Sequence, residues 1–285
     1  SLDATWKRRA EHACFPLASC FIADCLERGQ DFDRGGARYN WVENSFVGTA
    51  NLVDSLVAVR ELVYARGRFT LAEFFSILRS NYQGCEPLRQ EILHRLPKYG
   101  NDDDSADSLA VEMTRFYEQT CAQHLIAGRH PFVPGMFCWV KHVSFGQVTG
   151  ATPDGRPAEF ALADGAGPAQ GRERCGPTAA AKSVTKWNHK PMLGGVVLNL
   201  KFSPSAFKRP EDRTKLGLLL TTYMRLGGFE AQVNVVSRHT LLRAQQHPEE
   251  HRDLLVRVAG YSDYFTHLSP PRQAEIIART EYAEA

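Results

Sequence analysis

One glycine of this chain stands where the lack of a side chain has chemical consequences. Gly260 follows the apolar run 256–259 and precedes Tyr261. If a hydrogen atom is removed from the Cα of a glycine, the radical can lie flat and delocalise into both flanking peptide groups, because no Cβ clashes with the planar form. A glycine after an apolar run is equally typical of a turn that ends a buried strand. Residues 255–264 alone leave both interpretations open.

Other sequence patterns that could indicate a functional site are weaker. The segment 176–183 resembles a phosphate-binding loop, but Ala181 stands where that loop needs its second glycine. His247 and His251 have a spacing that can place them on one helix face, but no third ligand follows at a recognisable spacing. Helix capping explains the aspartates 102–104 without a cation. We predict no metal site and no nucleotide site.

Composition limits the classes of function. The chain has 285 residues, 43% of them hydrophobic and 23% charged, with a net charge of +2 and no basic stripe. This argues against nucleic acid as a partner. No stretch approaches the ~20 apolar residues that span a bilayer, and no signal peptide is evident. The seven cysteines form no dense framework, which favours reduced thiols in a cytoplasmic or compartmented setting.

Helices are expected to dominate the first half. Apolar residues recur at helical spacing over 10–27 and 48–65. Thr70 and Glu73 have capping-box spacing at the start of a helix over 70–82. Further helices are expected over 88–95, from the aspartates to residue 119, and over 216–226 and 272–282.

Strands are expected mainly in the second half, over 139–144, 196–202, 231–237 and 254–259. The segment 150–177 is expected to be a long loop rich in Gly, Pro, Ala and Asp. Helices that alternate with nearly continuous apolar strands predict an α/β architecture.

Several motifs, in order along the chain, carry a family resemblance. The segment around Gly260 reads R-V-A-G-Y-S, and upstream stand G-G-A-R-Y-N at 35–40, K-Y-G-N-D-D at 98–103, G-A-T-P-D-G-R at 150–156 and L-N-L-K-F-S-P at 198–204. Shorter matches are G-P-T at 176–178, Q-V-N-V-V at 232–236 and I-I-A-R-T-E at 276–281. Together they closely resemble the glycyl radical enzymes, the family of pyruvate formate-lyase and glycerol dehydratase, over residues 12–282.

The resemblance implies a fold and a partner. Such enzymes have a ten-stranded α/β barrel made of two five-stranded halves, and this chain is similar to the C-terminal portion only. Residues 1–149 would be the C-terminal part of the pyruvate formate-lyase-like barrel domain, mostly helical, and 150–285 the glycine radical domain. An activating enzyme with S-adenosylmethionine and an iron–sulfur cluster would install the radical on Gly260, and no cofactor would stay bound. The full enzyme would be a homodimer in an anaerobic cytoplasm or a bacterial microcompartment.

Four further residues are expected to support the radical loop. Arg257 and Tyr261 flank Gly260 and would anchor the loop against the barrel, since side chains alternate along a strand. Gln232 and Asn234, on the neighbouring predicted strand, would hydrogen-bond the loop backbone, since buried polar groups need partners. Burial of Gly260 would be a functional demand, because dioxygen cleaves the chain at an exposed glycyl radical.

The cysteine that would form a thiyl radical has no counterpart. The text Gly84-Cys85-Glu86 resembles its surroundings in the family, but Cys85 lies downstream of the 35–40 motif, whereas the family cysteine lies upstream. Cys85 is expected to be a helix-turn residue. The chain begins at Ser1 in helix-like text, as a fragment would. We expect it to be inert alone toward a small-molecule substrate.

The subfamily is less sharply indicated. The text A-G-Y-S favours a dehydratase or lyase that acts on a small diol-like or related substrate over a pyruvate formate-lyase-type acyltransferase. Where dehydratases commonly have hydroxyl residues, residues 137–142 carry aromatic and cationic groups, including Lys141 and His142. If that segment lines the pocket, a larger or anionic substrate fits better. The alternatives are a spare-part subunit that supplies a glycyl radical domain, and a fragment with a structural role.

Overall fold

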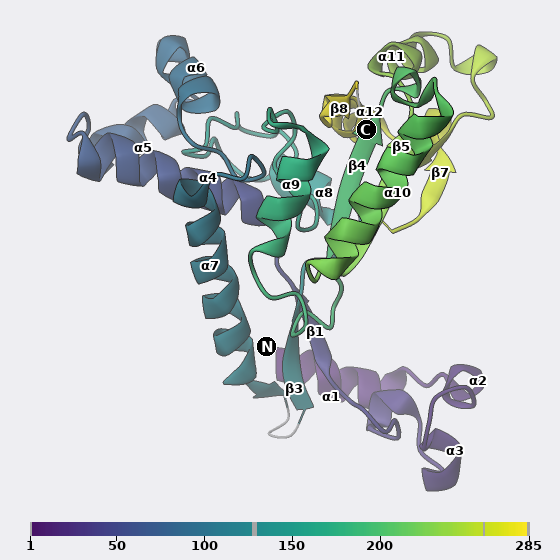
Figure 1. Cartoon of the computed structure of the whole chain (residues 1–285). Coiled ribbons are helices and arrows are strands. Elements are labelled where there is room, and N and C mark those ends of the chain that lie inside the picture. The colour runs from purple at the N-terminus through teal and green to yellow at the C-terminus, as the bar shows by residue number, and fades with distance from the viewer. Residues whose placement is uncertain (1, 127–129, 259, 284–285) are drawn as a thin grey trace.

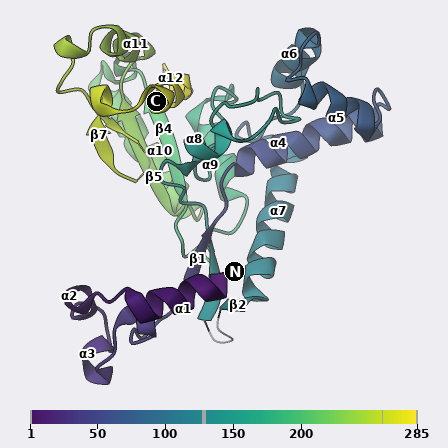
Figure 2. The same ribbon diagram turned by 180° about the vertical axis from the view of Figure 1, so that it is seen from behind.

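The computed structural model of the chain describes residues 2–126, 130–258 and 260–283. Figure 1 shows a group of helices around α4 to α7 on one side and the strands β4 and β5, with α10 against them, on the other. The N-terminal helices lie beside β1 and β3 at one end of the molecule, and the view from behind in Figure 2 shows the same arrangement. Among the described residues, no helix has the length and apolar character that crossing a bilayer requires.

The N-terminal region is not the single helix expected over 10–27. It contains α1 (Leu2–His12), α2 (Pro16–Ser19) and α3 (Cys25–Arg28), followed by the 3₁₀ turn Phe32–Arg34. Pro16 begins a new helix because proline cannot donate the hydrogen bond that a helix interior needs. Asp24 adopts the left-handed conformation (φ +74°) and separates α3 from what precedes it. The apolar periodicity was therefore a misleading signal, and its members Phe15, Leu17, Phe21 and Leu26 are exposed.

The helical group agrees with the sequence. It consists of α4 (Thr49–Val59), which continues as a π-helical turn over Arg60–Ala65, and of α5 (Leu71–Arg79), α6 (Glu86–Arg95) and α7 (Asp104–Ala122). Thr70 and Glu73 form the expected capping box, and the Asp103 side chain accepts from Ser105 N–H at the start of α7. Cys85 is the N-terminal cap residue of α6, as expected of a helix-turn residue.

Two small sheets contain mainly parallel strand pairs. In the first, β1 (Val42–Ser45) runs parallel to β3 (His130–Gly135), which pairs antiparallel with β2 (Leu125–Ile126). In the second, the central strand β4 (Val197–Phe202) lies parallel to both β5 (Glu230–Val235) and β8 (Glu281–Tyr282). The larger buried cluster includes Leu198, Leu200 and Phe202 of β4 together with residues of α9 (Gly176–Thr185) and α10 (Pro210–Arg225). The fold is mixed α/β, as predicted.

The strand predicted over 139–144 is wrong. That segment contains α8 (Lys141–Gln147), and the strand lies earlier, at β3. The chain reverses between them: Trp139 is left-handed (φ +52°), and Lys141 N–H donates to the carbonyl of Cys138. The helix predicted over 272–282 is right only in part, because α12 (Pro270–Ala278) ends at Arg279, whose extended backbone leads into β8.

The C-terminal part folds as a hairpin against helices. The strands β6 (Leu255–Arg257) and β7 (Ser262–Tyr264) pair antiparallel beside α11 (Arg238–Gln246) and α12. Short 3₁₀ turns lie at Pro204–Phe207, Pro248–Glu250 and Phe265–His267. The strand β6 is half-buried rather than buried, since Val256 is 2% and Leu255 58% exposed. Ala259, the last residue of the predicted strand, lies outside the described residues.

The T-P-D-G-R motif organises the loop between α8 and α9. Asp154 is fully buried and accepts hydrogen bonds from Asn51 Nδ2 (2.8 Å) and Thr152 Oγ1 (2.5 Å). Arg156 is 1% exposed and donates to the carbonyls of Phe160 (2.5 Å), Thr149 (3.3 Å) and Gly150. This motif therefore has a structural role here, because its side chains satisfy loop carbonyls that no strand or helix pairs.

We expect Arg156→Ala to lower the free energy of unfolding by about 3 kcal/mol, because three partly buried hydrogen bonds to loop carbonyls are lost at once. Urea denaturation measures the change. Arg243→Ala is the control, since Arg243 makes an exposed ion pair with Glu250, and such a pair contributes about 1 kcal/mol or less. Equal losses in the two variants would contradict the role assigned to Arg156.

Candidate functional site

Gly260 lies in the turn of the β6–β7 hairpin and is exposed in this chain. Its φ of +80° is in the left-handed region that side chains disfavour. A Cβ at this position would lie 2.4 Å from a ring carbon of Phe137. Two independent constraints, backbone conformation and the contact with Phe137, therefore require glycine here.

Two side chains of β5 reach the hairpin. Gln232 Oε1 accepts the N–H of Gly260 at 3.1 Å. Asn234 makes two hydrogen bonds with the backbone of Arg257, accepting from its N–H (2.7 Å) and donating to its carbonyl (2.9 Å). Both side chains are buried and two residues apart, so they share one face of the strand. The hairpin thus meets β5 through side-chain amides.

Arg257 and Tyr261, which were expected to anchor the loop, make different kinds of contact. The Arg257 guanidinium turns to the other strand of the hairpin, where Nη1 donates to Ser262 Oγ at 3.3 Å. Tyr261 is partly buried and packs against the apolar cluster formed by residues of β6, α11 and α12. The backbone of Arg257, rather than its side chain, carries the contacts with β5 and with Arg279, just beyond α12.

Arg279 is a residue at this site that the sequence alone did not single out. Its Nη2 donates to the carbonyl of Val258 at 2.7 Å, and its Nη1 to that of Arg257 at 3.4 Å. The same guanidinium makes a two-point ion pair with Glu275 at 3.0 and 2.9 Å. The spacing of Glu275 and Arg279, four residues apart, was the available signal, since such pairs meet on one helix face.

His142 extends this network. Its Nε2 lies 3.5 Å from Glu275 Oε2, and its Nδ1 lies 3.4 Å from Cys138 Sγ. Burial alone would lower the pKa of His142, but the Glu275 carboxylate and the Cys138 contact raise it to about 10. Burial alone would raise the pKa of Glu275, but Arg279 and His142 hold it well below its usual range. His142 is therefore a buried cation, whereas Lys141 beside it is exposed.

Residues 137–142 do not form the strand that was expected to line a pocket. The Phe137 ring faces Gly260, and the His142 imidazole faces Glu275. Phe137 and His142 of this segment are thus engaged within the chain, whereas Trp139 and Lys141 are exposed.

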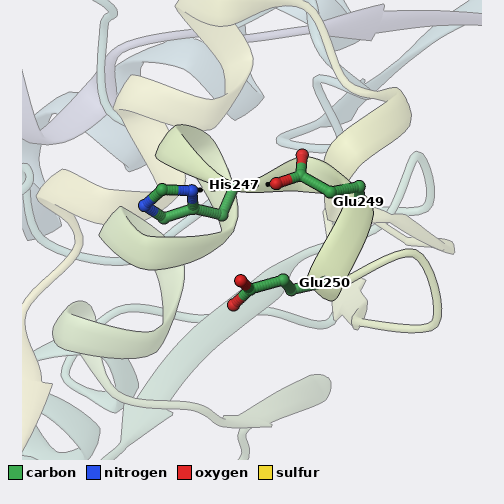
Figure 3. A group of neighbouring side chains, drawn as sticks. All are labelled: His247, Glu249 and Glu250. Carbon is green, nitrogen blue, oxygen red and sulfur yellow. Dashed lines mark ion pairs between the residues drawn. The ribbon is translucent and has the colours of Figure 1, made fainter.

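The remaining residues that the sequence offered as site candidates either pair with other side chains of the chain or are exposed. In the phosphate-loop lookalike, Ser183 donates to Asp107 and Lys182 pairs with Asp102. His247 and His251 do not share a helix face, because the 3₁₀ turn Pro248–Glu250 separates them. His247 instead lies near Glu249 and Glu250, with one potential metal-ligand atom from each within 4.8 Å of the others (Figure 3). All three are exposed, and Arg243 already pairs with Glu250.

Comparison with known proteins gives the geometry its context. Residues 2–146 match the family described as pyruvate formate lyase-like, and residues 162–266 match the family described as glycine radical. A probable dehydratase, YbiW, of Escherichia coli is 43% identical over 275 residues, which cover 93% of this chain and 34% of that protein. The trans-4-hydroxy-L-proline dehydratase of Clostridioides difficile is 37% identical over 95% of this chain and 34% of its own length.

A solved structure agrees. The glycerol-bound, B12-independent glycerol dehydratase of Clostridium butyricum superimposes with a TM-score of 0.92 at 39% identity, over 97% of this chain and 35% of that one. The chain thus spans about a third of the length of these relatives. Since both family matches and the fold agree along almost the whole chain, it belongs to the glycyl radical enzymes, as the motifs around Gly260 predicted.

Proposed function

We propose that this chain is the part of a glycyl radical enzyme that stores an organic radical on Gly260. The observation that carries the proposal is the position of Gly260 itself. A left-handed backbone and the Phe137 ring exclude a side chain, and Gln232 fixes the glycine N–H. In the complete enzyme the radical would oxidise a cysteine to a thiyl radical, which abstracts hydrogen from the substrate.

The surrounding residues have distinct proposed roles. Gln232 accepts from the N–H of the radical-bearing residue, which keeps that peptide group oriented as the spin delocalises. Asn234 holds the strand that leads to Gly260 through the backbone of Arg257. Tyr261 secures the far side of the turn by packing, and Arg257 braces the two strands of the hairpin through Ser262.

The relatives support the class of reaction. They are dehydratases and lyases, including enzymes named for glycerol, 1,2-propanediol and trans-4-hydroxy-L-proline. We propose elimination from a small diol-like or related substrate, in a barrel of which this chain supplies one half. Residues 1–149 would belong to the barrel domain and 150–285 to the glycine radical domain. A radical S-adenosylmethionine activating enzyme is the proposed partner, and a homodimer in an anaerobic cytoplasm the proposed setting.

A spare-part subunit is the second candidate. A separate glycyl domain must present its glycine to another polypeptide, and Gly260 is exposed in this chain. Restoration of turnover in a relative that lacks its own radical glycine would separate this role from that of a covalent part of one enzyme.

Anaerobic activation followed by electron paramagnetic resonance tests the proposal. We expect a doublet from the chain treated with an activating enzyme, no doublet from Gly260→Ala, and no substrate turnover by this chain alone. Deuteration of the glycine α-positions should collapse the doublet without any change in structure. Gly227→Ala is the matched control, since Gly227 has φ +97° and a Cβ there meets nothing within 4 Å. A doublet that survives in Gly260→Ala, or no signal from a folded wild-type chain, contradicts the proposal.

A further inference from the structure

The Gly260 hairpin is attached to the rest of the chain in an unusual way. Within the described residues, the backbone ladder of β6 is formed with β7, and the sheet β5–β4–β8 does not include it. The bridge to β5 consists of the Gln232 and Asn234 side chains, which together make three hydrogen bonds to the hairpin backbone. Side chains can release such bonds without breaking a ladder.

Arg279 supplies the second attachment, from another direction. It lies just beyond the end of α12 and donates to two successive carbonyls, those of Arg257 and Val258. These carbonyls belong to the strand that leads into Gly260. The carbonyl of Arg257 is thus shared by Asn234 and Arg279, so both attachments meet at one peptide group.

The position of Arg279 is fixed by buried charge. Glu275 holds the guanidinium at two points, and Asp164 lies 3.4 Å from it. His142 Nε2 lies 3.5 Å from Oε2 of the same carboxylate. Two cations and two carboxylates balance in a region where all four side chains are less than a tenth exposed. Such a balanced, two-point pair orients a guanidinium more firmly than an isolated pair does.

We propose that Arg279 is a positioning residue that clasps the Gly260 hairpin to the sheet, and that the hairpin opens as a unit when this clasp releases the Arg257 and Val258 carbonyls. The clasp itself is independent of the chemistry at Gly260. Its consequence for radical lifetime rests on the proposed function, because an opened hairpin exposes Gly260 on every side.

Hydrogen exchange of the complete chain tests the clasp without any radical. The amides of Arg257, Val258 and Gly260 are hydrogen-bonded in the closed hairpin and report on its opening. We expect Arg279→Gln to speed their exchange roughly 10- to 100-fold while amides of β4 keep their rates. Arg272→Gln, within α12, is the control, because Arg272 makes no side-chain hydrogen bond or ion pair with a described residue. The hairpin amides of this variant should exchange as in the wild type.

Arg279→Lys keeps the charge opposite Glu275 but loses the fork that reaches two carbonyls. It should fold and give a smaller acceleration, still confined to the hairpin. Exchange at the control rate in both Arg279 variants overturns the proposal. Acceleration that is equal in β4 and the hairpin, or global unfolding of both Arg279 variants, overturns it too, because Arg279 would then support the whole chain.

The lifetime of the radical is the second measurement. In the activated chain, Arg279→Gln should shorten the lifetime of the resonance signal under anaerobic conditions, and Arg272→Gln should not. An unchanged lifetime despite faster hairpin exchange would overturn the functional part. Absence of any signal in the wild-type chain would instead refute the proposed function. The hydrogen-exchange result would then still test whether Arg279 holds the hairpin.

Discussion

Admission of air to the activated chain is expected to cut it at Gly260. The glycine is exposed at the apex of a hairpin, and the contact that crowds it comes from one side, from Phe137. The described residues therefore leave Gly260 accessible to dioxygen. Mass spectrometry should find two fragments that end and begin at this residue, in an amount that matches the spins counted before exposure.

The unactivated chain and Gly260→Ala provide the controls, and both should stay intact in air. If the resonance signal disappears while the activated chain remains whole, the spin is not on Gly260. Cleavage at a second glycine would have the same meaning. A partner polypeptide that covers Gly260 would slow the cleavage.

Local signals made the helical region predictable. Gly48 before α4, the Thr70–Glu73 capping box and the Asp103 cap each fix a helix start through bonds within a few residues. The strands β4 and β5 were also evident as mainly apolar runs, although β5 buries the amide side chains of Gln232 and Asn234. The errors fell where chain reversal decides the outcome. Periodicity over 139–144 could not reveal that Trp139 adopts a left-handed conformation just before α8 begins at Lys141.

The residues of the site divide in the same way, into those that local patterns indicate and those that long-range contacts bring together. Gly260 was predicted from its own motif, and the hydrogen bonds of Gln232 and Asn234 from the need of buried loop backbone for polar partners on a neighbouring strand. Arg279, Glu275 and His142 escaped, because their meeting depends on contacts across more than a hundred residues, such as that between α8 and α12. The sequence near α12 contains a strong clue only in retrospect: a glutamate and an arginine four apart among buried isoleucines, where unpaired charge is costly.

His142 is expected to make the stability of this protein depend on pH in the alkaline range. Burial alone lowers the pKa of His142, and the Glu275 carboxylate overrides that effect and raises it to about 10. Because the folded pKa is above the unfolded one, of about 6.5, the contribution of His142 is fully present below pH 6.5. It is lost as the pH rises toward 10, at about 1.4 kcal/mol per pH unit for one proton.

Urea denaturation of the wild type and of His142→Gln between pH 6 and pH 10 measures this contribution as a difference. The difference in the free energy of unfolding should be largest at pH 6 and should shrink steadily above pH 6.5. Lys201, whose pKa burial lowers to about 8, titrates in both proteins and cancels. His239→Gln, which changes an exposed histidine, should differ from the wild type by the same small amount throughout. A His142→Gln difference that is constant with pH would mean that folding leaves the pKa of His142 unchanged, so that the Glu275 carboxylate does not raise it.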